Sequence, residues 1–412
     1  MIKMKYESLK ALYYQNPEKF EQIYQSRFNS PEAVKTGLYV FPYDKRRQTR
    51  LRKSYEMFYL PNAQLSVLIE DVFQYTQKIE RIRLRLPKIA EVQLFTTNLV
   101  NELQSTNEIE GVKSTRREIN EVIKRVNDHD YRNQRFEGLV KQYLNLMHHK
   151  PLKIERLQDF RTIWNNLLSK AEVEAEPDGK LFRKDPVFIT DGRKNIHEGD
   201  YNEEQISQAL TTLIAELNNK QIPQLPRYLM GHYFYEYIHP FYDGNGRTGR
   251  YILCSFLAQV LDPLTAITFS STIAKKKSSY YKAFMEMSDK HNRAEATSFI
   301  IKMLQILKNG QIDLLDAMQG DAAILKKADN LLKEYEISDL AKQVLYVLCQ
   351  QAIFGTKYDR IKDLELCKLV GISRYKLNQA IAELDEKKLI KRVSSSPAIH
   401  VISDGLNDKL YE

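Results

Sequence analysis

Residues 238–250 of this 412-residue chain read Ile-His-Pro-Phe-Tyr-Asp-Gly-Asn-Gly-Arg-Thr-Gly-Arg, and this stretch decides how the sequence around it folds. The residues before it, from Pro226 onward, place apolar side chains at helical spacing, and Pro240 ends that helix. An apolar run follows the glycines, so a second helix begins at Asn245 or Gly246. Its unpaired N–H groups and positive dipole end face the turn, which predicts an anion-binding site between the two helices.

Four side chains of the turn suit a phosphate group. Arg247 and Arg250 lie three residues apart on the second helix, so both can donate forked hydrogen bonds to phosphate oxygens. Asp243 offers a hard oxygen ligand of the kind that Mg²⁺ takes together with phosphates and water. His239 adds a group that can accept a proton near neutral pH. Because these groups converge on one turn, they favour a chemical site over a plain helix–helix turn with a buried histidine.

Two other sites that the same residues could form, a dinucleotide-binding turn and a zinc site, are less well supported. Gly244-x-Gly246-x-x-Gly249 formally fits the dinucleotide fingerprint, but no strand precedes it. His232, His239 and Asp243 suggest zinc, but no third ligand with good spacing is present. A phosphate-binding turn therefore explains the segment best.

Residues 239–250 resemble the signature HxFx(D/E)GNGRxxR of the Fic family and match it at every specified position. The resemblance implies a mainly α-helical, Fic-type bundle with a β-hairpin flap. It also implies a protein adenylyltransferase, which moves AMP from ATP onto a Ser, Thr or Tyr hydroxyl of a protein substrate or of itself. His239 would take the proton of that hydroxyl, which attacks the α-phosphate, and pyrophosphate would leave.

The resemblance also implies the cofactors, ATP and Mg²⁺, and the residues that hold them. Asp243 would bind the metal ion, and the glycine-rich turn would cradle the phosphates. A phosphate-transferring relative carries Lys at the position of Gly246, so the glycine favours nucleotidyl transfer. The residues expected to bind ATP or to shape its site are Phe241, Gly244, Asn245, Gly246, Arg247, Arg250, Tyr280 and Tyr281.

A second motif lies upstream, in Ser-Thr-Asn-Glu-Ile-Glu-Gly at 105–111. Thr106 and Glu110 stack on one face of a helix, and Gly111 suits the position just after the helix end. The segment resembles the inhibitory motif (S/T)xxxE(G/N) of Fic proteins. That resemblance implies that Glu110 pairs with Arg250 and occupies the place that the γ-phosphate of ATP needs. In some relatives the same glutamate positions a water molecule for removal of AMP, so the net direction of the reaction stays open.

Turn signals interrupt the helical pattern at 175–197, where Asp-Gly pairs flank apolar residues and predict a β-hairpin. The segment resembles the flap that covers the Fic site and holds the target segment by strand addition. An ordinary exposed hairpin is the alternative. The docking residues that the resemblance implies are Gly179, Leu181, Phe182 and Arg183.

Apolar spacing of three and four dominates residues 60–350, and Gly and Pro are sparse, so the predicted fold class is mainly α. The sequence of residues 1–60 indicates no distinct function. The predicted domains are an N-terminal helical lead-in at 1–88, a Fic domain with the inhibitory helix at 89–334 and a winged helix-turn-helix domain at 335–412. Helices are expected at 61–84, 90–110, 115–127, 134–148, 153–169, 202–219, 225–238, 246–261, 277–290, 293–309 and 312–333.

The tail has the order helix, short helix, turn, helix and two short strands, which resembles a winged helix-turn-helix module. The outward residues of its 373–387 helix, which would face base edges in a DNA reader, are Arg374, Tyr375, Asn378 and Gln379. Residues 336–412 hold 12 basic and 11 acidic residues, a poor balance for binding phosphates. Protein docking or homodimerisation is therefore favoured for this module. A DNA-binding transcriptional regulator with a nucleotide-sensing Fic domain is the alternative function.

The chain carries a net charge of +9 and no run of 18 or more apolar residues, so we expect a protein that neither enters a membrane nor is secreted. Cys254, Cys349 and Cys367 lie far apart among apolar residues, which predicts buried, reduced thiols and a cytoplasmic location. Much of the positive charge lies at 45–53 and 81–88. Solvated surface is the simplest interpretation of both runs.

Overall fold

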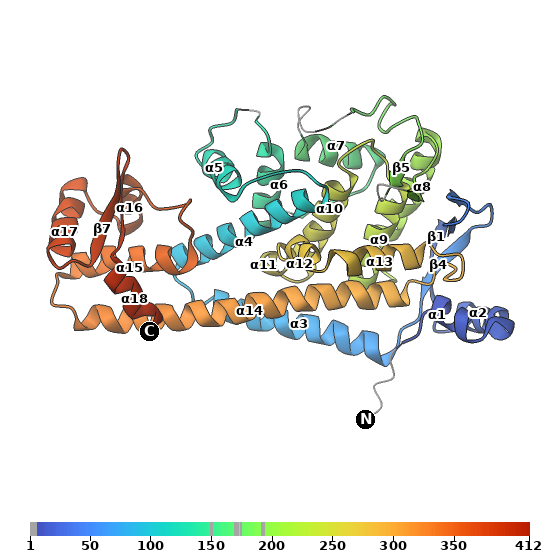
Figure 1. The fold of residues 1–412 in the computed structure, drawn as a ribbon, viewed down its shortest axis with the longest axis horizontal. Helices are drawn as coiled ribbons and strands as arrows, with labels where there is room; N and C mark the ends of the chain where they lie inside the picture. The colour runs from blue at the N-terminus through green and yellow to red at the C-terminus, as the bar shows by residue number, and fades with distance from the viewer. Residues whose placement is uncertain (1–5, 133, 149–150, 169–172, 174, 191–193) are drawn as a thin grey trace.

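The computed structural model describes residues 6–132, 134–148, 151–168, 173, 175–190 and 194–412. Within these ranges the protein is mainly α-helical with small antiparallel hairpins, as predicted (Figure 1). No helix in the described part of the chain is both long and apolar enough to cross a membrane.

The longest helix forms the base of the molecule. α14 (Thr297–Glu334) runs along most of its length, with α3 (Ala63–Arg83) beside it (Figure 1). Gln311 of α14 donates through Nε2 to the Val72 carbonyl at 3.1 Å and to Thr76 Oγ1 at 2.9 Å. These buried hydrogen bonds fix α14 against α3.

The sequence predicted two helices, 293–309 and 312–333, where α14 is continuous, and this prediction is wrong. Gly310 does not interrupt the helix because the helix passes close to α12 (Phe269–Lys275) at this point. A Cβ at position 310 would lie 2.6 Å from Thr268 Oγ1, so the glycine is required for close packing rather than for a break.

Three helices carry the sequence motifs. They are α4 (Lys88–Ile109), α9 (Gln224–Ile238) and α10 (Asn245–Val260), and their bounds differ from the predicted ones by no more than two residues. The helices that surround them are α5 (Arg116–Asn127), α6 (Glu137–Met147), α7 (Leu157–Leu167), α8 (Glu203–Leu217), α11 (Pro263–Ala266), α12 and α13 (Lys277–Met287). The sequence did not predict the short helices α11 and α12.

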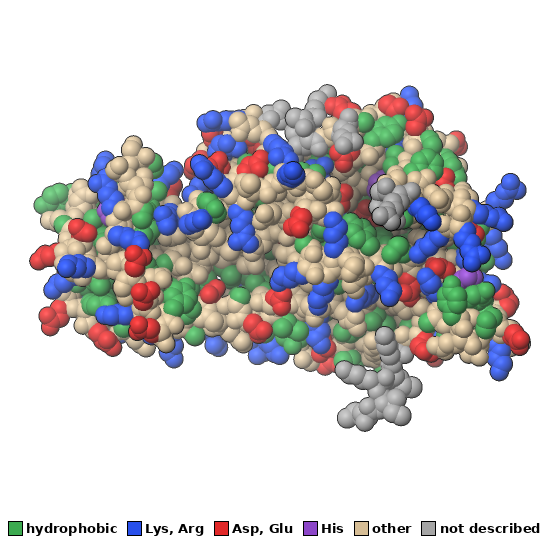
Figure 2. All heavy atoms as spheres, viewed as in Figure 1, with side chains coloured by type: hydrophobic (Ala, Val, Ile, Leu, Met, Phe, Trp, Pro, Cys, Tyr) green, Lys and Arg blue, Asp and Glu red, His purple; other side chains and the backbone are tan. Residues whose placement is uncertain are grey.

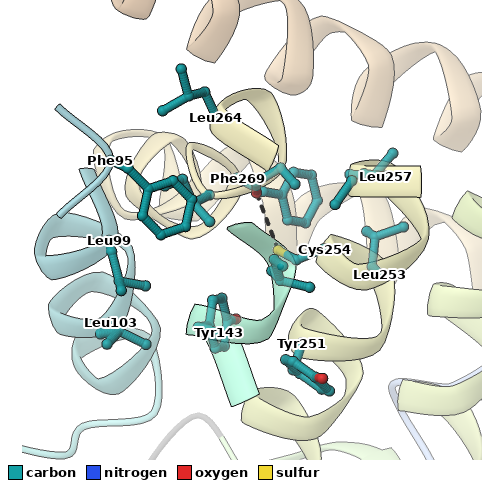
Figure 3. Close-up of a cluster of buried hydrophobic side chains, with 14 of the residues drawn as sticks. Phe95, Leu99, Leu103, Tyr143, Tyr251, Leu253, Cys254, Leu257, Leu264 and Phe269 are labelled. Atoms are coloured by element: carbon teal, nitrogen blue, oxygen red, sulfur yellow. Dashed lines mark hydrogen bonds between the residues drawn. The ribbon is translucent and has the colours of Figure 1, made fainter. Parts of the chain in front are cut away.

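A buried apolar core lies between α4 and α10 (Figure 3). Phe95, Leu99 and Leu103 of α4 contribute to it together with Leu253 and Leu257 of α10. Burial also raises the pKa of the Cys254 thiol, which donates to the Ala266 carbonyl at 3.2 Å. All three cysteines are free thiols, as predicted, although Cys367 is only half-buried.

The lead-in is only partly helical, which corrects the prediction for residues 1–88. Its first elements are α1 (Leu9–Gln15), the 3-10 turn η1 (Pro17–Lys19) and α2 (Phe20–Phe28). Two antiparallel strand pairs follow, β1 (Val34–Val40) with β4 (Tyr55–Tyr59) and β2 (Tyr43–Asp44) with β3 (Thr49–Arg50). Residues of β1 alternate between core and surface, with Leu38 and Val40 buried, which is the pattern of a half-buried strand.

A further hairpin forms in the predicted flap region, but it is shorter than the predicted segment. β5 (Phe188–Thr190) pairs antiparallel with β6 (Asn195–Glu198), with Phe188 opposite Glu198. The Asp-Gly turn predicted at 191–192 lies outside the described residues. We call the strand pair β5–β6 the flap hairpin.

The tail has the predicted order of elements. These are α15 (Asp339–Phe354), α16 (Asp363–Val370), α17 (Arg374–Glu386), β7 (Ile390–Ser395) and β8 (Ala398–Ile402), followed by an unpredicted α18 (Asp404–Tyr411). This tail packs on the first half of α4 (Figure 1). Gln350 Oε1 accepts from the Ala90 N–H at 3.2 Å, and the Phe354 carbonyl accepts from Thr97 Oγ1 at 2.9 Å.

Candidate active site

His239 is the residue that ends α9, and its geometry makes it a proton acceptor. Its backbone is left-handed, with φ 55°, and its N–H donates to the Tyr235 carbonyl at 3.1 Å. Its ring Nδ1 lies 3.3 Å from the Glu236 carbonyl, which accepts only, so this nitrogen carries the hydrogen. The other nitrogen, Nε2, therefore keeps a lone pair.

The electrostatic surroundings keep His239 neutral. Burial and, to a smaller extent, the nearby Arg183 guanidinium lower the pKa of His239 to about 4. At neutral pH the imidazole is therefore unprotonated and ready to act as a base.

Arg183 holds the backbone that carries His239. Its Nε donates to the His239 carbonyl at 2.8 Å, its Nη2 to the Ile238 carbonyl at 3.3 Å and its Nη1 to the Asp185 carbonyl at 2.6 Å. The side chain is fully buried, and burial lowers its pKa to about 10, so it remains charged at neutral pH. A cation suits this place because the last carbonyls of a helix form its negative end.

A second cation reaches the same helix end from the lead-in. Arg50 donates through Nη2 to the Tyr237 carbonyl at 3.0 Å and pairs through Nη1 with Asp200 at 2.5 Å. His197 Nε2 lies 2.8 Å from the same carbonyl. The sequence analysis missed this role of Arg50, because a basic residue in a charged run gives no signal of a partner 187 positions away.

The turn after His239 closes on itself. The side-chain amide of Asn245 accepts from the Phe241 N–H at 2.9 Å and donates to the Phe241 carbonyl at 2.7 Å. Phe241 is buried and stacks on Trp164 with ring centroids 5.1 Å apart, while Trp164 Nε1 donates to the Asp243 carbonyl at 2.9 Å. Phe241 thus lies in the core and fixes the turn there, and Asn245 offers only its backbone to a ligand.

Asp243 and Arg247 lie together at the start of α10. Asp243 Oδ1 accepts from the Gly244 N–H and lies 3.7 Å from Arg247 Nη2. The Asp243 side chain is 31% exposed, so its carboxylate can meet a ligand, whereas Arg247 is buried. A half-exposed carboxylate beside a helix start with two arginines fits a divalent cation bound together with phosphates. No group of three or more His, Cys, Asp or Glu side chains in the described residues is arranged to hold a metal ion by protein ligands alone.

The second sequence motif contacts the first. Arg250 donates through Nε to Thr106 Oγ1 at 2.9 Å and through Nη2 to Glu110 Oε1 at 3.0 Å. Glu110 also lies against the first turn of α10, because a Cβ at Gly246 would come within 2.2 Å of Glu110 Oε1. The structure therefore brings the two motifs together across 140 positions of sequence. Gly111 follows the helix with φ 74°, the left-handed conformation that favours glycine.

One of the two tyrosines assigned to ATP is placed differently from the prediction. Tyr280 is 3% exposed, its hydroxyl bonds to His232 Nε2 at 2.8 Å, and its ring packs on Phe284. It lies on the inner face of α13 with its hydroxyl already bonded, so the structure gives this assignment no support. Tyr281 is 37% exposed and remains a candidate.

The predicted docking residues also lie elsewhere than expected. Gly179, Leu181, Phe182 and Arg183 precede the flap hairpin and form no strand. Phe182 and Arg183 are fully buried, so they cannot receive a target segment. The Glu203 carboxylate, which the sequence analysis missed, accepts the N–H groups of residues 180, 181 and 182 at 2.8, 2.5 and 2.9 Å and consumes the donors that strand addition needs.

Two comparisons with known proteins agree with this architecture. Residues 152–257 match the Fic/DOC family, and this span holds the catalytic turn and the flap hairpin. The fold is similar to the crystal structure of a Fic family protein from Desulfovibrio desulfuricans G20, with a TM-score of 0.50 and 19% identity. The match covers 84% of this chain and 98% of that protein, and at this identity the likeness concerns the fold. Residues 152–257 are therefore similar in sequence to the Fic/DOC family.

Proposed function

We propose that this chain is a protein adenylyltransferase that moves AMP from ATP onto a hydroxyl of a protein, and that Glu110 inhibits it. The single observation that carries the proposal is the place of His239 in the turn before α10, where its Nδ1 faces the Glu236 carbonyl and leaves the lone pair of Nε2 as the proton acceptor. The Fic/DOC domain supports it, because members of that family commonly transfer AMP or other nucleotide groups to proteins.

In this proposal each group of the turn has one task. Nε2 of His239 accepts the proton of a Ser, Thr or Tyr hydroxyl as the hydroxyl oxygen bonds to the α-phosphorus. The bond from that phosphorus to the oxygen bridging the β-phosphate breaks, and pyrophosphate leaves with the electron pair. The first N–H groups of α10 and Arg247 bind the phosphate oxygens. Asp243 would hold Mg²⁺, which neutralises phosphate charge when bound.

The contact of Glu110 with Arg250 supports the inhibited state. Arg250 is the cation that we assign to the terminal phosphate, and Thr106 and Glu110 occupy its Nε and Nη2 donors. Glu110 also takes the space beside Gly246 that the triphosphate would need. Removing the Glu110 side chain should therefore free Arg250 Nη2 from its ion pair and open the space beside Gly246, while Nε stays bonded to Thr106.

The test is labelling of native lysate proteins with ATP and Mg²⁺, followed by mass spectrometry. Glu110→Gly should raise incorporation of AMP, and Glu110→Gly combined with His239→Ala should abolish it. Glu108→Gly is the matched control, because Glu108 lies on the same helix end, is exposed and forms neither a hydrogen bond nor an ion pair with Arg250. A Glu110→Gly protein that binds ATP but modifies neither itself nor any lysate protein would contradict the proposal.

The direction of the reaction is part of the same test. If Glu110 positions water for removal of AMP, the wild-type protein should strip AMP from proteins that the Glu110→Gly variant has labelled. The matched reaction with the Glu110→Gly variant should leave the label in place.

A second candidate function rests on the surface of α17. Arg374, Tyr375, Asn378 and Gln379 are all exposed, with Tyr375 at 72%. This favours a role of the tail in binding DNA, with the Fic/DOC domain sensing nucleotides. DNA binding should then fall steeply with salt and collapse in an Arg374→Ala/Lys376→Ala variant. An unchanged gel shift would exclude it.

A further inference from the structure

The lead-in hairpin β2–β3 covers one edge of the flap hairpin. Tyr43 Oη donates to the Asn195 carbonyl at 2.9 Å, and Gln48 Oε1 accepts from the Asn195 N–H at 3.1 Å. Further along, Glu198 Oε2 accepts from the Arg50 N–H at 3.0 Å. Among the described residues β5 pairs only with β6, so the outer edge of β5 is the edge that can accept another strand.

The two ends of the flap hairpin have different neighbours, His239 at one end and the lead-in hairpin at the other. At its base, the Gly199 N–H donates to the Val187 carbonyl, and a Cβ at Gly199 would lie 3.2 Å from the His239 Cβ. At its other end, Asn195 meets Gln48 of the lead-in hairpin. A segment that adds to β5 with its acceptor hydroxyl at His239 therefore runs towards the lead-in hairpin.

The loop of that hairpin presents only positive charge to solvent. Lys45, Arg46 and Arg47 are exposed (Figure 2 shows Lys and Arg side chains gathered over this end of the molecule). Asp44 Oδ1 accepts from the Arg46 and Arg47 N–H groups at 2.9 and 3.3 Å, which fixes the loop backbone.

The acidic side chains nearby are already engaged. Asp200 pairs with Arg50, and Glu198 is 4% exposed and bonded to the lead-in hairpin. Asp44 itself is turned to the loop backbone and has a side chain only 12% exposed. Asp44 therefore opposes part of the charge of Arg47, but because its carboxylate is mostly covered, the three cations dominate the exposed surface of this hairpin.

We propose that loop 45–47 binds an acidic segment of the protein substrate. A strand advances about 3.3 Å per residue, so the acidic residues would lie roughly four to six positions from the acceptor hydroxyl. This inference rests on the proposed function, because that function places the acceptor hydroxyl of the substrate at His239. The binding itself requires no transfer chemistry, so the two can be tested separately. Arginine and lysine of a preformed loop would supply specificity and association rate rather than most of the affinity.

The experiment measures binding by fluorescence anisotropy with the full-length protein. The probe is a labelled peptide in which three alanines separate a Thr from three glutamates, made in both chain directions, and a matched peptide carries three glutamines. The Glu probe should bind more tightly than the Gln probe at low salt. The Lys45→Gln/Arg46→Gln/Arg47→Gln variant should weaken binding of the Glu probe about tenfold and leave the Gln probe unchanged.

A control variant with the same change of net charge separates the loop from long-range attraction. Lys326, Lys368 and Lys387 are exposed on α14, α16 and the end of α17, and Lys326→Gln/Lys368→Gln/Lys387→Gln should bind the Glu probe like the wild type. Equal losses in both triple variants would overturn the proposal. So would an oligonucleotide that binds the loop more tightly than the Glu probe, because the surface would then be a nucleic-acid site.

A kinetic readout links the loop to the site. In the Glu110→Gly background, the loop variant should raise KM for the Glu probe about tenfold while kcat and KM for ATP stay the same. Transfer that is insensitive to the loop would overturn the docking proposal and leave the proposed function standing. Binding of the Glu probe that depends on the loop, without transfer of AMP to any protein, would support the docking proposal and contradict the proposed function.

Discussion

The glycine-rich turn at 239–250 and the neighbouring segment, described at 179–190 and 194–198, are closed in different ways. The turn is closed by its own residues, since the Asn245 side chain bonds both backbone groups of Phe241, four positions away. The other segment depends on distant partners, with Glu203 holding its first part and the lead-in hairpin covering β6. Local contacts leave a readable pattern in a sequence, whereas contacts between distant positions do not.

The largest expected effect tests the turn itself. His239→Ala in the Glu110→Gly background should lower the rate of AMP transfer by about 10³-fold, because a positioned base is worth roughly 10²–10⁴-fold. With a pKa of about 4, His239 stays neutral in mild acid, so the rate should stay flat from about pH 8 to about pH 5.5. Transfer of radiolabelled AMP at several pH values measures both the loss of rate in His239→Ala and the pH dependence of the rate. His129→Ala, an exposed histidine, is the control. A rate that halves near pH 6.5 would contradict the assignment.

The next effect tests whether the turn needs its distant partner. Arg183→Ala should lower kcat about 10²-fold with little change in KM for ATP, because the His239 backbone loses the guanidinium that holds it. The pKa of His239 should also rise, since the Arg183 charge helps to lower it, and the rate should then fall at a higher pH. Arg183→Lys should restore part of the lost kcat and part of the lowering of the His239 pKa. Exposed Lys184→Ala is the control. An Arg183→Ala protein with normal kcat would show that the turn stands alone.

A smaller effect concerns the segment before the flap hairpin. Glu203→Ala should reduce the free energy of unfolding by about 1–2 kcal/mol, because three N–H groups lose their acceptor. Burial tends to raise the pKa of Glu203, but the N–H donors outweigh it and lower the pKa. This contribution is therefore present above the unfolded-state pKa and is lost as pH falls through the lower, folded-state pKa. Urea unfolding at pH 7 and in acid measures it. Glu204→Ala should have no effect, and equal stability of the two variants would count against the role of Glu203.

The smallest effect concerns the contact between the two motifs. Thr106→Val removes the hydroxyl that accepts from Arg250 Nε but keeps the shape of the side chain. It should raise AMP transfer only about fivefold, less than Glu110→Gly, because one hydrogen bond is worth about 1 kcal/mol. Initial rates of labelling measure it. Ser105→Ala, one position away, is the control, and a rise as large as that of Glu110→Gly would assign the inhibition to Thr106.

Much of the fold followed from the sequence, and the misses share a cause. The spacing of apolar residues and the Pro and Gly residues at helix ends located α4, α9 and α10 to within two residues, because both signals depend on neighbouring positions in the chain. The sequence around Tyr280 does not reveal that its hydroxyl meets His232 on α9. The break predicted at Gly310 failed for a similar reason, since only the closeness of Thr268 explains the glycine.

The sequence by itself determined that two helices meet at the turn in 239–250, that His239, Asp243 and the arginines lie in that turn, and that the upstream helix ends at Glu110. These features depend on backbone preferences and on residues within a few positions of one another. Only the tertiary structure decided that Arg250 meets Thr106 and Glu110, that Arg50 and Arg183 hold the end of α9, and that His239 is neutral. Burial and contacts between distant residues fix these properties, and both arise only when the chain is folded.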